Sequence, residues 1–104
     1  MASSVDFVEY VMEQLEGVGV LRYRKMFGEY CVYVNEKPIV LVCDDMVYLK
    51  IVPELAEAMK GAEKGFPYEG AKERYILEVD DGDLARRAVG ILERVTLMPR
   101  AKRK

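Results

Sequence analysis

The stretch RYRKMFGEYCVYV-NEKP-IVLVC-DD-MVYLK, residues 22–50, decides the fold of this chain. It contains three runs of five to seven β-branched, aromatic and aliphatic residues, which two short polar turns separate. Consecutive antiparallel strands have this pattern in sequence. The stretch therefore predicts a meander of three strands, which the chain enters through a basic and aromatic segment.

Alternation along the meander assigns its side chains to the two faces of a sheet. One face takes Tyr30, Val32 and Val34, and the other takes Glu29, Cys31 and Tyr33. The next strand, residues 39–43, is apolar on both faces and therefore belongs in the middle of a sheet with both sides covered. Helices from so short a chain cover one face more readily than two. We therefore expect a partner, most simply a second copy, over part of the face that carries Tyr33 or Tyr48.

Apolar residues at helical spacing predict three helices around this meander. The first begins at a serine N-cap near Ser3 and stops at Gly17, the second opens at Pro53, and the third covers residues 84–95. Residues 74–79 add a further strand. The expected fold class is α+β: a single two-layer domain with three helices and a four- or five-stranded, mainly antiparallel sheet. The expected order is α-β-β-β(-β)-α-β(-β)-α.

The length of 104 residues allows one domain, which we place at residues 1–99, followed by a basic tail at 100–104. Hydrophobic residues make up 51% of the chain and charged residues 33%, which excludes a disordered chain. No apolar run approaches the roughly 20 residues of a membrane span, and the N-terminus lacks the basic and apolar parts of a signal peptide. We expect a cytoplasmic protein that binds no membrane.

The formal net charge of −2 is unevenly distributed along the chain. Residues 1–99 carry 12 basic and 18 acidic side chains, a net charge of −6. The tail holds the other four cations, Arg100, Lys102, Arg103 and Lys104. Such a tail predicts weak phosphate affinity that falls as salt rises, whereas the acidic body repels phosphate over most of its surface.

Histidine is absent, which removes the commonest general base and the commonest metal ligand. Hydroxyl side chains are few, and they comprise Ser3, Ser4 and Thr96 besides the tyrosines. Two cysteines alone do not make a zinc site. We therefore expect no catalytic residue, no metal site and no cofactor, and we expect that the protein is not an enzyme.

The two cysteines, Cys31 and Cys43, fall on consecutive predicted strands. A three-residue loop would place them directly opposite each other, which allows a disulfide, and a two-residue loop would offset them by one. In a cytoplasmic protein we expect two reduced thiols. Either thiol would be nucleophilic only if a cation such as Arg24 or Lys25 activated it.

The meander also carries a family resemblance. The run from Arg24 to Tyr30, followed by Tyr33, resembles R-x-M-F-G-G-Y-G-x-Y, and residues 41–50 resemble A-L-V-x-D-D-x-L-Y-L-K. Both patterns belong to the N-terminal domain of the TfoX (Sxy) competence-regulator family. The resemblance continues through residues 66–70 and spans roughly residues 5–95, with Glu29 and Cys31 in place of two family glycines and without the family tryptophan. It implies the same α+β fold.

The resemblance implies a regulatory role, because full-length family members activate competence genes together with the cyclic-AMP receptor protein. Those proteins carry a second, helical domain to which nothing in this chain corresponds. We therefore expect a non-enzymatic protein-interaction domain with an unidentified regulatory partner. Its expected interaction surface consists of Arg22, Arg24, Lys25, Tyr33 and Tyr48.

The alternative is a nucleic-acid-associated protein that uses the basic tail together with Arg22, Arg24 and Lys25. This alternative predicts binding that weakens steeply with salt and drops when residues 100–104 are removed. The protein-interaction hypothesis predicts indifference to both, and the acidic body favours it.

Overall fold

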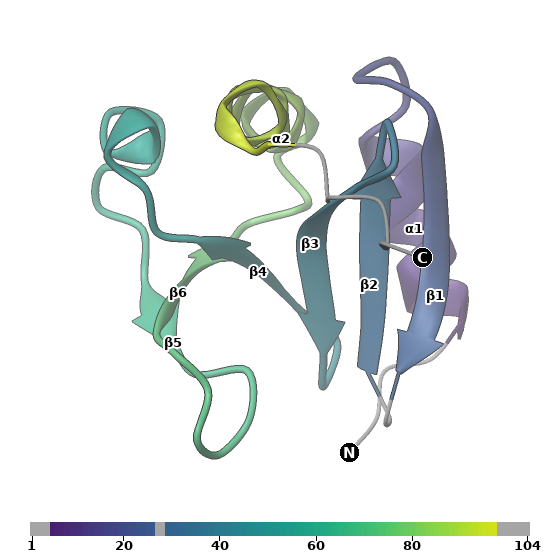
Figure 1. Cartoon of the computed structure of the whole chain (residues 1–104), viewed down its shortest axis with the longest axis horizontal. Helices are drawn as coiled ribbons and strands as arrows, with labels where there is room; N and C mark the ends of the chain where they lie inside the picture. The colour runs from purple at the N-terminus through teal and green to yellow at the C-terminus, as the bar shows by residue number, and fades with distance from the viewer. Residues whose placement is uncertain (1–4, 27–28, 98–104) are drawn as a thin grey trace, which may run out of the picture.

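The computed structural model describes residues 5–26 and 29–97, and Figure 1 shows their arrangement. The helices are α1 (Val5–Gln14), the 3₁₀ helix η1 (Pro53–Leu55) and α2 (Gly82–Val95). The strands are β1 (Leu21–Met26), β2 (Glu29–Val34), β3 (Lys37–Cys43), β4 (Met46–Lys50), β5 (Lys64–Gly65) and β6 (Arg74–Leu77). The predicted N-cap at Ser3 and the predicted tail at 100–104 lie outside the described residues.

The strands form one sheet in the order β1-β2-β3-β4-β6-β5, and every neighbouring pair is antiparallel. The α+β class and the meander are confirmed, and β3 lies between two partners as its apolar sequence predicts. The described residues form six strands, however, and not four or five. The additional strands lie at the two edges of the sheet. The basic strand β1 pairs with β2 over six residues, and β5 pairs with β6 over two residues. Backbone hydrogen bonds hold an edge strand in place while its charged side chains stay in water. A prediction from apolar runs therefore finds too few edge strands.

The predicted second α-helix is wrong. Residues 53–62 form η1 followed by turns, in which the Ala56 N–H donates to the Pro53 carbonyl at 3.1 Å and the Ala62 N–H to the Met59 carbonyl at 3.0 Å. This spacing of three residues belongs to the tighter 3₁₀ helix, which occurs in short pieces. Gly61, at φ +81°, ends the segment before an α-helix can propagate.

Both hairpin turns of the meander place two consecutive residues in the left-handed backbone region. Asn35 and Glu36 have φ of 53° and 69°, and Asp44 and Asp45 have φ of 55° and 57°. Two such residues in succession form the type I′ turn, whose twist matches that of the flanking strands. Asn and Asp tolerate this conformation better than most residues, which explains three of the four positions.

A register shift in the first hairpin decides where the cysteines lie. The pairing of β2 with β3 shifts between Val32 and Tyr33, so that Cys31 stands opposite Leu41. Cys43 is therefore two residues further along the same face of β3. Neither predicted alignment occurs, since the cysteines are offset by two, and both thiols are free.

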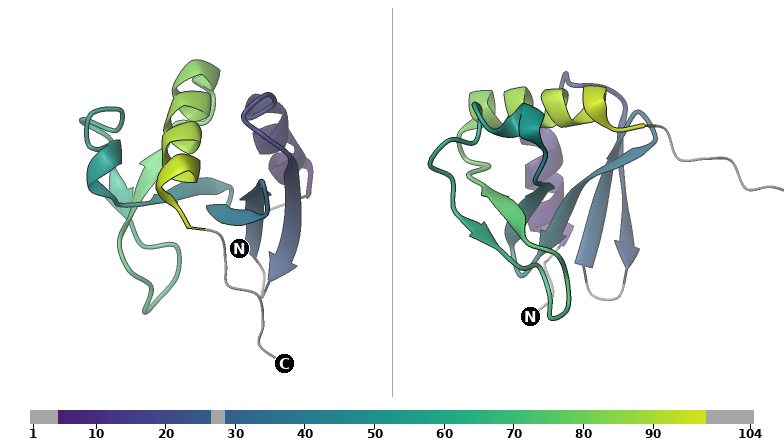
Figure 2. Two further views of the ribbon diagram at one scale, coloured as in Figure 1. Left: turned by 45° about the horizontal axis from the view of Figure 1, so that its top comes forward. Right: turned by 60° about the vertical axis from the view of Figure 1, so that its left-hand side comes forward.

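The helices pack on one face of the sheet. In Figure 1, α1 lies behind β1 and β2, whose other face is turned toward the viewer, and Figure 2 shows α2 crossing above the middle of the sheet. The buried side chains between the helices and the sheet form one cluster, which includes Val79 after β6, whereas the buried Cys31 and Tyr48 lie outside it. The helices and the segment after β4 contribute Val8, Val11, Leu15, Leu55, Met59, Ala85, Ala88, Val89 and Leu92. The sheet contributes Tyr30, Val32, Val34, Ile39, Val40, Val42, Val47, Leu49, Tyr75 and Leu77.

Truncation of a central sheet residue tests this one-sided core. Leu49 on β4 is fully buried, so Leu49→Ala is expected to lower the free energy of unfolding by about 2–5 kcal/mol, because it removes apolar contacts and leaves a cavity. Val20, which is 69% exposed, provides the control, and Val20→Ala should change the free energy by no more than about 0.5 kcal/mol. Urea denaturation measures both. Equal, small effects would contradict this core.

Candidate functional site

The face of the sheet opposite the helices, which we call the open face, carries a row of side chains that crosses five strands. The register aligns Arg24, Cys31, Leu41, Tyr48 and Ile76 from β1 to β6. Cys31 and Tyr48 are buried, and Leu41 and Ile76 are half-buried. The centre of the open face is therefore apolar, with a cation at its β1 end.

The open face is concave, and a groove of about 510 Å³ runs along it. Arg74 of β6 acts electrostatically on Glu29 and Cys31 of β2, although β3 and β4 separate these strands in the sheet. Figure 1 shows why: β4 and β6 turn away from the plane of β1, β2 and β3. The groove is lined by Glu29, Cys31, Leu41, Lys50, Lys72 and Arg74 from the open face and its edge. Ile39 and Val40 of β3, and Leu92 and Thr96 at the C-terminal end of α2, line it as well.

Three of these groove residues are cations that make no ion pair within the described part of the chain. Lys50 and Arg74 stand directly opposite each other on β4 and β6, and Lys72 lies just before β6. The ion pairs of the described residues are elsewhere: Arg22–Glu36, Lys37–Glu93 and Arg86–Asp83. The groove is therefore locally basic on a chain whose body is acidic.

Glu29 is the acidic group of the groove. Its Oε1 atom is buried and has no hydrogen-bond partner within residues 5–26 and 29–97. Burial raises the pKa of the Glu29 carboxyl, and the positive charge of Arg74 acts in the opposite direction. The arrangement offers three cations along one apolar floor, with the Glu29 carboxyl beside them.

The comparison with known proteins identifies the family of this chain. The family model of the TfoX N-terminal domain matches residues 13–82, which include all six strands of the sheet. The chain belongs to the TfoX N-terminal domain family. It is also similar to an uncharacterized 12.7 kDa protein in the trpE 5′ region of Spirochaeta aurantia, with 33% identity over 78 residues. The matched region is 75% of this chain and 68% of that protein.

Two departures from the family pattern lie in the groove of this TfoX N-terminal domain. Glu29 and Cys31 stand where the pattern has glycine, and both line the groove. Each adds a side chain where the pattern has none. The Glu29 carboxyl therefore makes the open face more polar than a glycine would. The two side chains also make the groove narrower along β2 than two glycines would leave it.

The predicted interaction residues are only partly brought together. Arg22, Arg24 and Tyr33 lie on the open face, at the β1–β2 end. The Arg22 guanidinium lies 4.2 Å from the centre of the Tyr33 ring and hydrogen-bonds Glu36 at 2.9 and 3.1 Å, which holds the pKa of the Glu36 carboxyl below its usual range. Much of the Arg22 charge is thus already satisfied.

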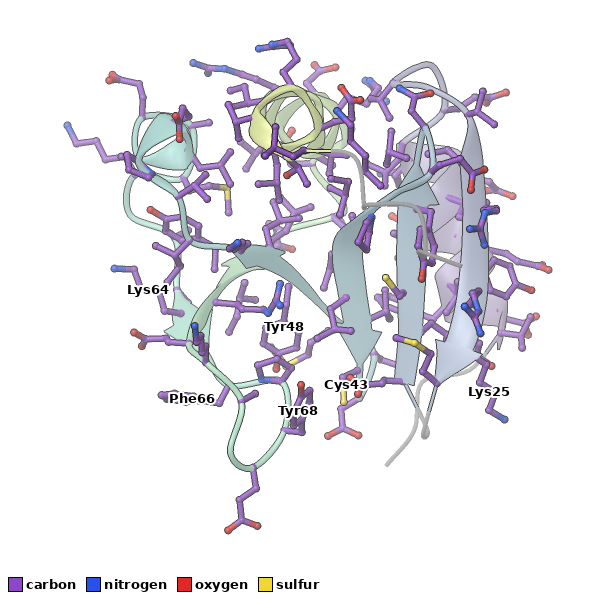
Figure 3. The ribbon with its side chains drawn as sticks, in the orientation of Figure 1. Lys25, Cys43, Tyr48, Lys64, Phe66 and Tyr68 are labelled. Atoms are coloured by element: carbon purple, nitrogen blue, oxygen red, sulfur yellow. The ribbon has the colours of Figure 1, made fainter. Side chains whose placement is uncertain are left out.

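The other two predicted residues do not join this group. Tyr48 lies on the open face but is buried, and its hydroxyl contacts the Met46 sulfur at 3.8 Å. Lys25 pairs with Tyr30, which alternation along β2 places on the helix-covered face. Figure 3 shows Lys25 pointing outward, far from Tyr48. The predicted surface of five residues therefore divides into one cluster on β1 and β2, one buried tyrosine and one outlying lysine.

Sequence reasoning missed the groove residues Lys50, Lys72, Arg74 and Glu29 as a group. Lys50 and Arg74 become neighbours because β6 pairs with β4 after 23 intervening residues, and no short-range pattern gives that register. The available signal was the alternation itself, which assigns Glu29 to the face of Cys31. Only the folded chain shows that none of the three cations forms an ion pair within the described residues.

The cysteines do not have the environment of a nucleophile. Burial raises the pKa of the Cys31 thiol and of the Cys43 thiol. A reactive cysteine needs a lowered pKa, because the thiolate is the reactive species. Within residues 5–26 and 29–97, no three acidic or cysteine side chains are grouped as metal ligands, and no helix is long and apolar enough to cross a membrane.

Removal of the Arg74 charge tests the curvature of the open face. Arg74→Gln is expected to raise the pKa of Glu29 further, because the nearby positive charge that favours the carboxylate is lost. Carbon-13 NMR of the Glu29 carboxyl through a pH titration measures the shift. Arg87→Gln, an exposed change on α2, is the control and should leave that pKa unchanged.

The raised pKa of Glu29 also predicts how the free energy of unfolding depends on pH. Because the pKa of Glu29 is raised on folding, its stabilising contribution is complete below the unfolded pKa and is lost as pH rises through the folded pKa. Glu29→Gln should therefore flatten the dependence of the free energy of unfolding on pH in this range. If neither Arg74→Gln nor Glu29→Gln has these effects, β6 does not face β2 across a groove.

Proposed function

We propose that this TfoX N-terminal domain is a non-enzymatic regulatory module that binds a protein partner on its open face. The observation that carries the proposal is the groove, which the open face and the C-terminal end of α2 line together. Apolar side chains form its floor and unpaired cations lie along it. Specific interfaces combine such an apolar centre with a polar rim.

The open face carries more apolar surface than an isolated sheet face needs. Leu41, Cys43 and Ile76 are only half-buried, and Tyr68, which lines the groove, is 52% exposed. Figure 3 shows Tyr68 below the same end of the sheet as Tyr48 and Cys43. Contiguous exposed apolar surface with a polar rim marks interaction sites on soluble proteins. Coverage by a partner removes this surface from water.

Charge favours a different protein over a second copy on this face. Two copies that meet groove to groove would oppose Lys50, Lys72 and Arg74 of each chain, and close like charges repel. The family supports a regulatory role, since its members include competence regulators. We therefore propose a heterologous partner, with the homodimer as the alternative arrangement for the same face.

A nucleic-acid function is the second candidate, and the basic groove favours it. Tyr68 and three cations line one groove, and aromatic rings among cations bind single strands. The basic residues 100–104 would extend that positive charge in sequence beyond Thr96, which lines the same groove. The net charge of −6 over residues 1–99 opposes a polyphosphate outside the groove, and for this reason a protein partner ranks first.

An affinity pull-down from nuclease-treated lysate of the source organism tests the proposal. Four baits are compared: the intact chain, a chain that ends at Pro99, a groove variant with Tyr68→Ala and Lys72→Ala, and a matched control with Leu97→Ala and Lys60→Ala. All four substituted side chains are exposed, so each variant should fold. We expect one protein to be retained by every bait except the groove variant, on which recovery should fall at least tenfold.

Two results would contradict the protein-interaction proposal. One is equal retention of the same protein by the groove variant and the control, which would place the binding surface elsewhere. The other is recovery of nucleic acid from lysate without nuclease that is lost with residues 100–104. Light scattering of the purified chain at tens of micromolar is expected to show a monomer, and a stable dimer would assign the open face to a second copy.

A further inference from the structure

We propose that Lys50, Lys72 and Arg74 form a carboxylate-binding site and that the protein partner occupies the groove with an extended acidic segment. The inference rests on the proposed function, because it names the chemistry of the partner for the same face.

The first argument is the arrangement of like charges. Lys50 and Arg74 are direct cross-strand partners, and such a pair of like charges destabilises a sheet. Within the described residues, neither forms an ion pair, whereas Arg22, Lys37 and Arg86 each have a carboxylate within 3.1 Å. A carboxylate bound between Lys50 and Arg74 would convert this repulsion into attraction.

The second argument is the geometry of the donors. Side chains directly opposite in an antiparallel pair have Cβ atoms about 5 Å apart, so the Lys50 ammonium and the Arg74 guanidinium can reach one carboxylate. Guanidinium groups bind carboxylates through two parallel hydrogen bonds. Lys72, two residues before Arg74 and on the same groove, supplies charge for a second carboxylate along the segment.

The third argument is the apolar floor of the groove. Glu29 Oε1 is buried and therefore does not itself face a ligand in the groove. A phosphate ion has no apolar part to cover Leu41 and Cys31, whereas an extended peptide can place an aliphatic side chain over them. The floor therefore favours an acidic peptide over phosphate.

The fourth argument is the charge around the groove. Leu41 and Cys31 form an apolar floor, which suits an aliphatic side chain between two acidic ones. A second concavity, between α1 and β1, is lined by Glu9, Glu13 and Glu16 and would repel the same segment. The basic residues 100–104 share the sign of the groove. Electrostatics thus directs an acidic segment of another protein to the open face.

A short synthetic peptide tests the site without knowledge of the partner. The probe is acetyl-Glu-Leu-Glu-amide, and its neutral match is acetyl-Gln-Leu-Gln-amide. Nitrogen-15 NMR of the full chain should show saturable shifts at the amides of Lys50, Lys72 and Arg74 with the acidic peptide. Affinity for the neutral peptide should be at least tenfold weaker, because it lacks the carboxylates.

Substitutions assign the effect to the groove. Lys50→Gln with Arg74→Gln should weaken the acidic peptide at least tenfold, while Lys60→Gln with Arg87→Gln removes the same charge at exposed sites and should leave binding unchanged. If the first pair disturbs the fold, Lys50→Gln with Lys72→Gln changes only exposed side chains and should give the same loss.

Three results would overturn the carboxylate site: equal binding of the two peptides, equal loss in the groove and control variants, or shifts spread over all cations of the chain. Inorganic phosphate at the same concentration is the remaining arm, and tighter binding of phosphate than of the acidic peptide would also overturn it. These outcomes are separable from those of the pull-down. A partner that is lost on the groove variant, Tyr68→Ala with Lys72→Ala, while the acidic peptide does not bind would support the open face but refute its acidic ligand.

Discussion

The structure depends on burial of one face of a sheet that is apolar on both faces. Two α-helices and the short η1 segment supply enough apolar surface for the face that carries Val32, Val40 and Leu49. A sheet whose central strand is apolar on both faces is normally covered on both sides. Among the described residues, only the C-terminal end of α2 borders the opposite face, where Leu92 and Thr96 line the groove beside Leu41. The helices of residues 5–26 and 29–97 thus leave most of this face free.

Curvature converts that free face into a site. The register shift in β2 and β3 and the two type I′ turns accompany a sheet in which β6 faces β2. A flat sheet would leave Arg74 three strands away from Glu29, whereas the curled sheet brings both onto one groove. Charges that are remote in the sequence and in strand order become neighbours, and three cations gather on one groove of an acidic chain.

The sequence predicts the local parts of this account better than the non-local ones. The meander, its face assignment and the central place of β3 follow from alternation over neighbouring residues and were confirmed. The 3₁₀ segment after Pro53 was predicted as an α-helix, because apolar spacing does not distinguish one turn from three. The groove could not be predicted, since Lys50 and Arg74 meet only through the long-range pairing of β4 with β6. Lys25 was grouped with Arg22 and Arg24 by composition, although alternation already assigns it to the other face.

The central claim is that the open face is exposed in the free chain and covered in the complex. Methyl NMR with a neutral gadolinium chelate tests it most directly, because the chelate broadens methyl signals that solvent can reach. The account predicts strong broadening of the Leu41 and Ile76 methyl signals and little at Val32 and Leu49, with Leu41 and Ile76 protected once the captured partner is added. Equal protection of all four residues in the free chain would contradict an open face.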